Sequence, residues 1–300
     1  MIQNFAELLE IVQHISSKVV AVAAAQDPDV LEVAHMAGQQ RLAEFILIGD
    51  QNKIEELAHR HNYRLDHCQI LHEPDISQAA RKSIELLHSR QAHLPMKGLL
   101  PTSVFMQAVL DKEKGIRGSH LLSEISIIEK PDREGLLLIT DCAINIDPDL
   151  SAKKQIIENA VVLAQRIGYQ QPHVACITSL ETVNPSMQDT LDAAVLSKMA
   201  QRGQITGCIV DGPFALDNAL SMESAKHKGL DSPIAGNADI LLMSDIRMGN
   251  VLHKAITYIA KKPLATAIMG ARQPVIMTSR SDSPQDKLLS LALACVLCID

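Results

Sequence analysis

The stretch KVVAVAAAQDP, residues 18–28, determines the fold class of this 300-residue chain. Its apolar part, 18–25, predicts a buried strand. Asp27 and Pro28 then predict the start of a helix that runs to about Gln40, with Asp27 as the cap and Pro28 in the first position. A buried strand followed directly by a helix is the repeating unit of an α/β protein with a parallel sheet.

The same order recurs along the first third of the chain. We expect strands at 45–49 and 68–71, and helices at 50–59 and 76–90, with Asp50 capping the first of these helices. Thr102 is expected to cap a further helix through Leu110. Because the connecting loops are short, this alternation favours parallel strands with right-handed crossovers.

A hairpin interrupts the alternation in the middle of the chain. The apolar runs 125–130 and 136–140 are joined by the turn-rich segment 131–135. Alternation then resumes, with expected helices and strands that follow in chain order. The helices are 150–167, 187–201 and 250–261, and the strands are 173–178, 206–210, 238–243, 264–269 and 274–277. The hairpin is a natural place for a second domain to begin, and 300 residues suit two domains.

Composition excludes several classes of protein. Apolar residues make up 47% of the chain, but there is no Trp and there are only four Phe and three Tyr, so the core must be aliphatic. A net charge of −7 without a long basic run argues against binding to nucleic acid. We expect no membrane span, because no apolar stretch reaches about 18–20 residues, and no signal peptide, so a cytoplasmic location is expected.

Cysteine and histidine patterns do not predict a metal or redox site. The cysteines lie at 68, 142, 176, 208, 295 and 298, and those at 142, 176 and 208 fall in or beside apolar runs that predict buried thiols. Cys295 and Cys298 have redox spacing but lie deep in the last expected helix. The histidines between 59 and 72 straddle a helix end and a loop, so no metal is expected there.

The segment TSRSDSPQD, residues 278–286, concentrates the reactive groups of the chain. It predicts a polar loop after a strand, leading into a helix that opens at Ser283 with Pro284 in its first turn. A hydroxyl, a guanidinium and two carboxylates at a helix start suit chemistry on a phosphorylated substrate. Alternatively, Ser283 and Asp286 form an ordinary capping box with no further role.

Three other polar segments follow expected strands in the second half. They are 211–219, the long connection 226–239, and 244–250. Each alone is typical of a turn with ordinary caps. Together they favour a shared site, because parallel sheets place their sites at the carboxyl ends of their strands.

These segments, with 278–283, resemble the motifs of the phosphate acetyltransferase and phosphate butyryltransferase family. The matching residues are DGP-x-ALDNA at 211–219, HKG at 227–229, AG-x-ADIL at 235–241, GN at 249–250 and TSRSDS at 278–283. Their order and spacing resemble the butyryltransferase branch more closely. DCAIN at 141–145, MKG at 96–98 and VAAAQD at 22–27 also look like family positions, so the resemblance spans essentially the whole chain.

The resemblance implies a fold, a reaction and an assembly. The fold would be the two-domain α/β fold of isocitrate and isopropylmalate dehydrogenases, with an interdomain cleft. Its first domain would comprise 1–124 plus 270–300, and its second, 125–269, would form a homodimer or a higher homo-oligomer. The reaction would move a short acyl group, butyryl or branched-chain, between coenzyme A and inorganic phosphate by direct thiolate attack in a ternary complex. No metal and no cofactor would be needed, since coenzyme A is a substrate.

The resemblance also assigns roles to individual residues. Asp286 would be the general base toward the coenzyme A thiol, Ser279 would hydrogen-bond the sulfur, and Arg280 would bind phosphate and the oxyanion. Asp282 is a rival base, because Ser281-Asp282 stands where the acetyltransferase branch has Gly-Cys. The remaining substrate-binding candidates are Lys97, Thr102, Arg117, Asn145, Gly249 and Asn250.

Other functions remain as alternatives. A phosphotransacetylase is the nearest one. Hydroxyacid dehydrogenases share the implied fold, but they need clustered aspartates for a metal and a nicotinamide site, and we find no such cluster in the sequence. A non-catalytic ligand-binding protein on the same fold is a third alternative, against which Ser279, Arg280 and Asp286 argue.

Overall fold

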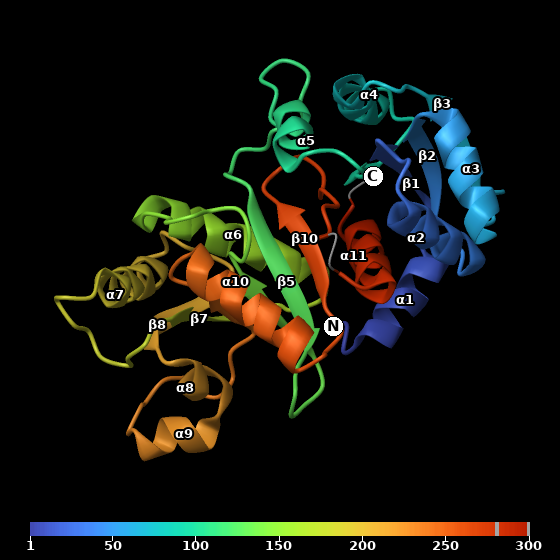
Figure 1. Ribbon diagram of the computed structural model, residues 1–300. Helices are drawn as coiled ribbons and strands as arrows, with labels where there is room; N and C mark the ends of the chain where they lie inside the picture. Colours follow the sequence, from blue (N-terminus) through green and yellow to red (C-terminus); the bar gives the residue numbers. More distant parts are fainter. Residues whose placement is uncertain (280–281, 299–300) are drawn as a thin grey trace. The chain divides into compact units, whose positions relative to one another are not determined.

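The computed structural model describes residues 1–279 and 282–298, and within them the chain is a mixed α/β protein (Figure 1). The described chain divides into two compact units. The N-terminal unit comprises Phe5–Ser119 and Ala265–Asp300, and the central unit comprises Met1–Asn4 and His120–Leu264. Across the described ranges, no helix combines the length and the apolar character that crossing a membrane requires.

The N-terminal unit alternates strands and helices, as the sequence predicts. Its elements are α1 (Phe5–His14), β1 (Lys18–Ala23), α2 (Pro28–Gln39), β2 (Ala43–Gly49), α3 (Gln51–His61), β3 (Cys68–His72), α4 (Ile76–His88), β4 (Leu94–Lys97), α5 (Thr102–Val109), β10 (Ala265–Met269) and α11 (Pro284–Leu297). Among the described residues, the first four strands form a parallel sheet in the order β3-β2-β1-β4.

Both faces of this parallel sheet are covered by helices. Side chains that alternate along β1 and β2, Ala21, Ile46 and Ile48, pack with Ala79 and Leu86 of α4. Residues of the opposite register, such as Val22 and Leu47, are fully buried as well. Burial on both faces explains why β1 is a continuous apolar run rather than an alternating one.

The central unit contains the antiparallel hairpin and a mixed sheet. Its elements are β5 (Ser123–Glu129), β6 (Leu136–Thr140), α6 (Leu150–Arg166), β7 (His173–Ile177), α7 (Gln188–Gln201), β8 (Ile209–Phe214), α8 (Leu216–Leu220), α9 (Met222–His227), β9 (Ile240–Leu242), α10 (Ile246–Lys254) and the π-helical turn η1 (Ala255–Ile259). The strands follow the order β5-β6-β9-β7-β8, and only the β5–β6 pair is antiparallel among these described pairings.

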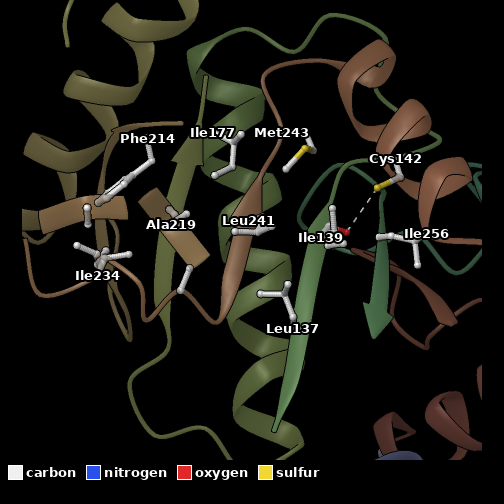
Figure 2. Packing of buried hydrophobic residues seen from close by; sticks show 14 of the residues in the cluster. Leu137, Ile139, Cys142, Ile177, Phe214, Ala219, Ile234, Leu241, Met243 and Ile256 are labelled. Carbon is white, nitrogen blue, oxygen red and sulfur yellow. Dashed lines mark hydrogen bonds between the residues drawn. The ribbon is translucent and has the colours of Figure 1, made fainter. Parts of the chain in front are cut away.

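One face of the central sheet carries an aliphatic core (Figure 2). Leu137 and Ile139 of β6, Ile177 of β7 and Leu241 of β9 project to this face. They pack with Ile256 of η1. The scarcity of aromatic residues therefore has the consequence expected from composition: this core is built almost wholly from aliphatic side chains.

Most helix starts follow the predicted caps. The side chains of Asp27, Asp50 and Ser283 each accept a hydrogen bond from a backbone N–H in the first turn, and these caps were expected from the sequence. Thr102 is an exception: α5 begins at Thr102 itself, and Pro101 occupies the cap position without a side-chain hydrogen bond. The predicted cap at Thr102 is therefore wrong by one residue.

The strand predicted at 206–210 is displaced toward the C-terminus. β8 spans Ile209–Phe214, so Asp211-Gly212-Pro213 lies inside the strand instead of in a loop after it. Pairing with β7 extends through Ile177 and Phe214, and the N–H of Thr178 donates to the carbonyl of Phe214. Tertiary pairing thus overrides the turn propensity of this segment, and the connection that follows contains α8 and α9.

Two further predictions are wrong in detail. α10 begins at Ile246, because the carboxylate of Asp245 accepts from the N–H groups of Arg247 and Met248, so Gly249 and Asn250 lie within the helix rather than at its start. The expected strand at 274–277 forms only isolated bridges through Val275 and Ile276. Neither α1 nor β4 was predicted from the sequence. In β4, Pro95 argues against a strand, because proline cannot donate a backbone hydrogen bond.

Candidate active site

The catalytic candidates follow a segment that lies beside β4. The N–H of Ile276 donates to the carbonyl of Pro95 at 3.0 Å, and the N–H of Lys97 donates to the carbonyl of Ile276 at 2.9 Å. Met96 and Ile276 form a parallel bridge. Because the two segments run side by side in the same direction, Lys97, the last residue of β4, and Ser279, three residues after Ile276, both lie toward the carboxyl edge of the parallel sheet.

The end of β1 is tied to the same edge. The N–H groups of Gly98 and Leu99 donate to the carbonyls of Ala23 and Ala24, at 2.9 and 2.8 Å. A Cβ atom at position 98 would stand only 2.4 Å from the carbonyl oxygen of Ala24. Glycine is therefore required for this close approach, which holds the start of the β4–α5 loop against β1.

Two hydrogen bonds join Ser279 and Asp282 ahead of α11. The N–H of Ser279 donates to Oδ2 of Asp282 at 2.7 Å, and the N–H of Asp282 donates to the carbonyl of Ser279 at 3.2 Å. Arg280, the predicted phosphate ligand, lies outside the described residues. One oxygen of Asp282 is thus engaged by the backbone of the loop itself.

Asp286 and Ser283 form the predicted capping arrangement. The N–H of Asp286 donates to Oγ of Ser283 at 3.1 Å, and the hydroxyl of Ser283 donates to Oδ2 of Asp286 at 2.7 Å. Oγ of Ser290 donates to the carbonyl of Asp286 and accepts from the N–H of Thr266 in β10, each at 2.8 Å. The capping alternative is therefore real, and it fixes the carboxylate of Asp286 at a helix start.

The other candidates of the N-terminal unit are distributed more widely. Lys97 is half-buried, and its Nζ donates to the carbonyl of Gly98 at 3.3 Å. Thr102 is exposed at the first residue of α5. Arg117 is also exposed, and its backbone pairs with Ala271. Of these three, Lys97 is hydrogen-bonded through its backbone N–H to Ile276, in the segment that leads to Ser279.

In the central unit, Asp141 organises the segment 141–145. This residue is 3% exposed, and its carboxylate accepts from the N–H groups of Ala143, Ile144 and Asn145. The side-chain Nδ2 of Asn145 donates to Asp141 at 2.5 Å and to the carbonyl of Leu122 at 2.9 Å. Both amide hydrogens of Asn145 are thus engaged, so a ligand would meet its Oδ1 as a hydrogen-bond acceptor.

Gly249 and Asn250 bring α10 against this same segment. A Cβ atom at position 249 would lie 2.2 Å from the carbonyl oxygen of Asp141. Nδ2 of Asn250 donates to the carbonyl of Cys142 at 3.3 Å. The Gly-Asn pair therefore has a packing role that the sequence alone did not indicate, because its geometry depends on a strand end more than 100 residues earlier in the chain.

A buried polar chain in the central unit was missed from the sequence. The hydroxyl of Ser126 donates to Oε1 of Glu124 at 2.9 Å, and Nδ1 of His253 lies 2.9 Å from the same hydroxyl oxygen. With the Ser126 hydrogen donated to Glu124, the hydroxyl oxygen of Ser126 can accept a hydrogen bond from Nδ1 of His253. Ser126 sits in an apolar strand and His253 in a helix 127 residues later, so no local pattern predicted their pairing.

The remaining motif residues stabilise local structure. Asp211 accepts from the hydroxyls of Ser197 and Ser232, at 3.1 and 2.6 Å. The hydroxyl of Ser224 donates to Asp217 at 2.6 Å and, with the nearby ammonium of Lys228, lowers the pKa of that carboxyl. These contacts join the loops around α8 and α9, which accounts for two of the polar positions in 211–229.

The cysteines of the described chain form no disulfide, and burial dominates the chemistry of most of their thiols. None of the six, all of which lie among the described residues, is in a disulfide bond, and Cys142, Cys176, Cys208 and Cys295 are buried. Burial raises the pKa of the Cys295 thiol to about 12, and it raises the pKa of Cys142 well above its usual range. Within residues 1–279 and 282–298, no group of three or more His, Cys, Asp or Glu residues is arranged to hold a metal ion.

Comparisons with known proteins agree along the whole chain. Residues 5–97 and 72–295 match the family model described as phosphate acetyl/butaryl transferase. The chain is 43% identical over 297 residues to the phosphate butyryltransferase of Clostridium beijerinckii, covering 99% of this chain and 98% of that protein. It is 41% identical over 279 residues to the phosphate acetyltransferase of Thermotoga maritima, with coverage of 93% and 95%.

Two solved structures share the fold. A branched-chain phosphotransacylase from Enterococcus faecalis V583 matches with a TM-score of 0.83 and 28% identity, covering 94% of this chain and 100% of that one. A 4-hydroxythreonine-4-phosphate dehydrogenase from Klebsiella pneumoniae matches with a TM-score of 0.57 and 12% identity, covering 93% and 98%. The α/β fold is thus shared with a phosphotransacylase and with a dehydrogenase.

Proposed function

Because the chain belongs to the phosphate acetyl/butaryl transferase family, we propose that it transfers a short acyl group reversibly between coenzyme A and inorganic phosphate. In one direction, acyl-coenzyme A and phosphate give acyl phosphate and free coenzyme A. The observation that carries this proposal is the match at 43% identity to a phosphate butyryltransferase over 99% of the chain. The alternative of a non-catalytic binding protein is disfavoured, because the catalytic candidates are all present.

We propose direct attack in a ternary complex as the mechanism. In the direction of acyl-coenzyme A synthesis, a carboxylate removes the thiol proton, the thiolate attacks the acyl carbonyl, and the carbon–oxygen bond to phosphate breaks. A thiol with a pKa of about 8.5 needs such a base to react well at neutral pH. Arg280 would stabilise the charge that develops on the oxyanion and the departing phosphate, and Ser279 would hydrogen-bond the sulfur.

Asp286 is the base that we favour over Asp282. The carboxylate of Asp286 accepts from a side-chain hydroxyl, which can rotate when a thiol approaches. The carboxylate of Asp282 accepts from the backbone N–H of Ser279, so one of its oxygens is already engaged by the main chain. Lys97, Thr102 and Arg117 would bind phosphate or the nucleotide end of coenzyme A. Asn145 would accept a hydrogen bond from substrate, beside Gly249 and Asn250.

Butyryl or branched-chain donors are proposed ahead of acetyl donors. Support comes from the sequence resemblance and from a structural match to a branched-chain phosphotransacylase at 28% identity. Purified protein should release thiol from butyryl- or isobutyryl-coenzyme A when phosphate is supplied. A series of acetyl, propionyl, butyryl and isobutyryl donors tests this directly. Preference for acetyl would favour a phosphotransacetylase, and no release with any donor would reject the transferase.

The assembly is part of the same proposal. The domains 1–124 plus 270–300 and 125–269 would bound an interdomain cleft, and the second domain would pair two copies. Exposed apolar side chains on α10 and η1 support this pairing: Val251 is 70% exposed, Tyr258 57% and Ile259 83%. Apolar side chains exposed together to this degree are typical of interaction surfaces. Sedimentation analysis should find at least a dimer, whereas a monomer at micromolar concentration would contradict it.

A further inference from the structure

Three lysines are nearly buried beside an aspartate in the described part of the chain. In each pair the lysine side chain is less than a tenth exposed. The pairs are Lys130–Asp239 at 2.5 Å, Lys153–Asp192 at 2.6 Å and Lys287–Asp29 at 2.7 Å. The first two acids are themselves only 15% and 12% exposed, whereas Asp29 is 48% exposed. Lys287, at 5%, is the least exposed of the three lysines.

The Lys287–Asp29 pair is therefore expected to contribute little to the stability of the folded chain. Removing an ammonium group from water is costly even after the protein relaxes around it. A buried acid attracts the ammonium group strongly and so offsets much of this cost. Water screens the same attraction when the acid is half-exposed, as Asp29 is. An apolar side chain of similar length at position 287 would fill the same space without that cost. Stability alone does not explain a lysine here.

The position of the pair suggests what it does. Lys287 directly follows Asp286 in the first turn of α11, and Asp29 lies in the first turn of α2, which begins just after β1. The pair joins residues 258 positions apart in the sequence and links two helix starts. Ser290 and Thr266 hold the same turn of α11 against β10. The backbone of Asp286 is thus held toward α2 by Lys287 and toward β10 by Ser290.

We propose that Lys287 is a positioning residue that, through its ion pair with Asp29, holds the carboxylate of Asp286 in the orientation needed for proton transfer. This inference rests on the proposed function, since it assumes that Asp286 acts as the base. Its consequence is specific: breaking the ion pair should reduce turnover more than it weakens substrate binding. Misplacement of a catalytic group by about 1 Å can reduce a rate by about a hundredfold.

The test compares Lys287→Met, Lys287→Arg and Asp29→Ala with the control Lys130→Met in the thiol-release assay. Lys130 pairs with Asp239, which directly precedes β9 in the central unit, and neither residue is among the catalytic or substrate-binding candidates, so this pair serves as a control. We expect Lys287→Met and Asp29→Ala to lower kcat about ten- to a hundredfold, with KM values within about threefold of wild type. Lys287→Arg should restore most of the rate, because a cation still reaches Asp29. Lys130→Met should lower the melting temperature and leave kcat unchanged per folded enzyme.

The possible outcomes separate the two hypotheses. An active wild type whose kcat is unchanged by Lys287→Met would overturn the positioning role alone. The positioning role is also overturned if activity falls only in proportion to folded protein, as in the Lys130→Met control. A wild type that is inactive with every donor would overturn the proposed function, and with it the base that Lys287 would position. If Lys287→Met does not fold, Asp29→Ala decides the question, because its half-exposed side chain can be removed without opening a core cavity.

Discussion

Ser283 and Asp286 are joined by two hydrogen bonds, one that caps a helix and one that holds a carboxylate. Oγ of Ser283 accepts from the N–H of Asp286 at 3.1 Å, and its hydrogen is donated to Oδ2 of Asp286 at 2.7 Å. One serine therefore satisfies the helix terminus and orients the proposed base. Capping and catalysis, which are alternatives in the sequence, are compatible at this position.

Replacing Ser283 by alanine should affect stability and catalysis together. Ser283→Ala removes the cap of α11, so we expect the free energy of unfolding to fall by about 1 kcal/mol, measured by denaturant titration. It also removes the hydroxyl that orients Asp286, so kcat should fall as well. Asp149→Ala removes the corresponding cap of α6 in the central unit and should lower stability without changing kcat. Equal effects of the two variants on kcat would contradict the proposal that the Ser283 hydroxyl orients Asp286.

Isosteric amides distinguish the two candidate bases. The amide of an Asp286→Asn variant can still accept from Ser283, and that of an Asp282→Asn variant can still accept from the N–H of Ser279, so neither change should disturb the loop. We expect Asp286→Asn to lower kcat by about a hundredfold or more with little change in the KM for coenzyme A, the effect typical of losing a general base. If Asp282→Asn causes that loss instead, the base is Asp282.

The sequence predicted what depends on near neighbours in the chain. The Ser283 cap, the α2 start at Asp27 and the β5–β6 hairpin are each set within a few residues, and the structure has them as expected. The contacts missed join distant segments: Lys287 with Asp29, and Ser126 with His253. No local propensity indicates such pairs, because each forms only when the folded chain brings two distant elements together.

Errors in element boundaries have the same origin. The neighbours of Gly249 indicate a helix start, yet this glycine serves the close packing of α10 on the carbonyl of Asp141. Pro213 favours the end of a strand, yet β8 continues to Phe214 because β7 pairs with it. Gly and Pro are reliable signals of local geometry, but a close tertiary approach and a turn require the same residues.

Arg280 should contribute mainly to the use of phosphate. An arginine can hold phosphate with two parallel charged hydrogen bonds, which alanine cannot replace. We expect Arg280→Ala to raise the KM for phosphate by about tenfold or more, while the KM for acyl-coenzyme A changes little. Initial rates at varied phosphate measure this. Arg272→Ala provides the control, since the described bond of Arg272 runs through its backbone N–H to Ile116. An unchanged dependence of the rate on phosphate in Arg280→Ala would count against phosphate binding by Arg280.

The thiols of Cys68 and Cys295 should react only slowly in the assay that detects free coenzyme A. Burial raises the pKa of Cys68 and of Cys295 to about 12 from a usual value of 9.0. A thiol with a pKa of about 12 instead of 9.0 has a thiolate fraction at about pH 8 that is lower on the order of a thousandfold, and the thiolate is the reactive form. Ellman's reagent should therefore label these two thiols slowly in the folded protein, and all six cysteines promptly in denaturant.

The same shift has a consequence for stability at alkaline pH. Between about pH 9 and pH 12, the folded chain keeps thiol protons that the unfolded chain has released. Deprotonation therefore favours the unfolded chain, so the free energy of unfolding should decrease as the pH rises through this window. Cys68→Ser removes one of these groups and should make the decrease shallower, as measured by denaturant titration at about pH 8, 9 and 10. A decrease as steep as that of wild type would show that the thiol of Cys68 does not contribute.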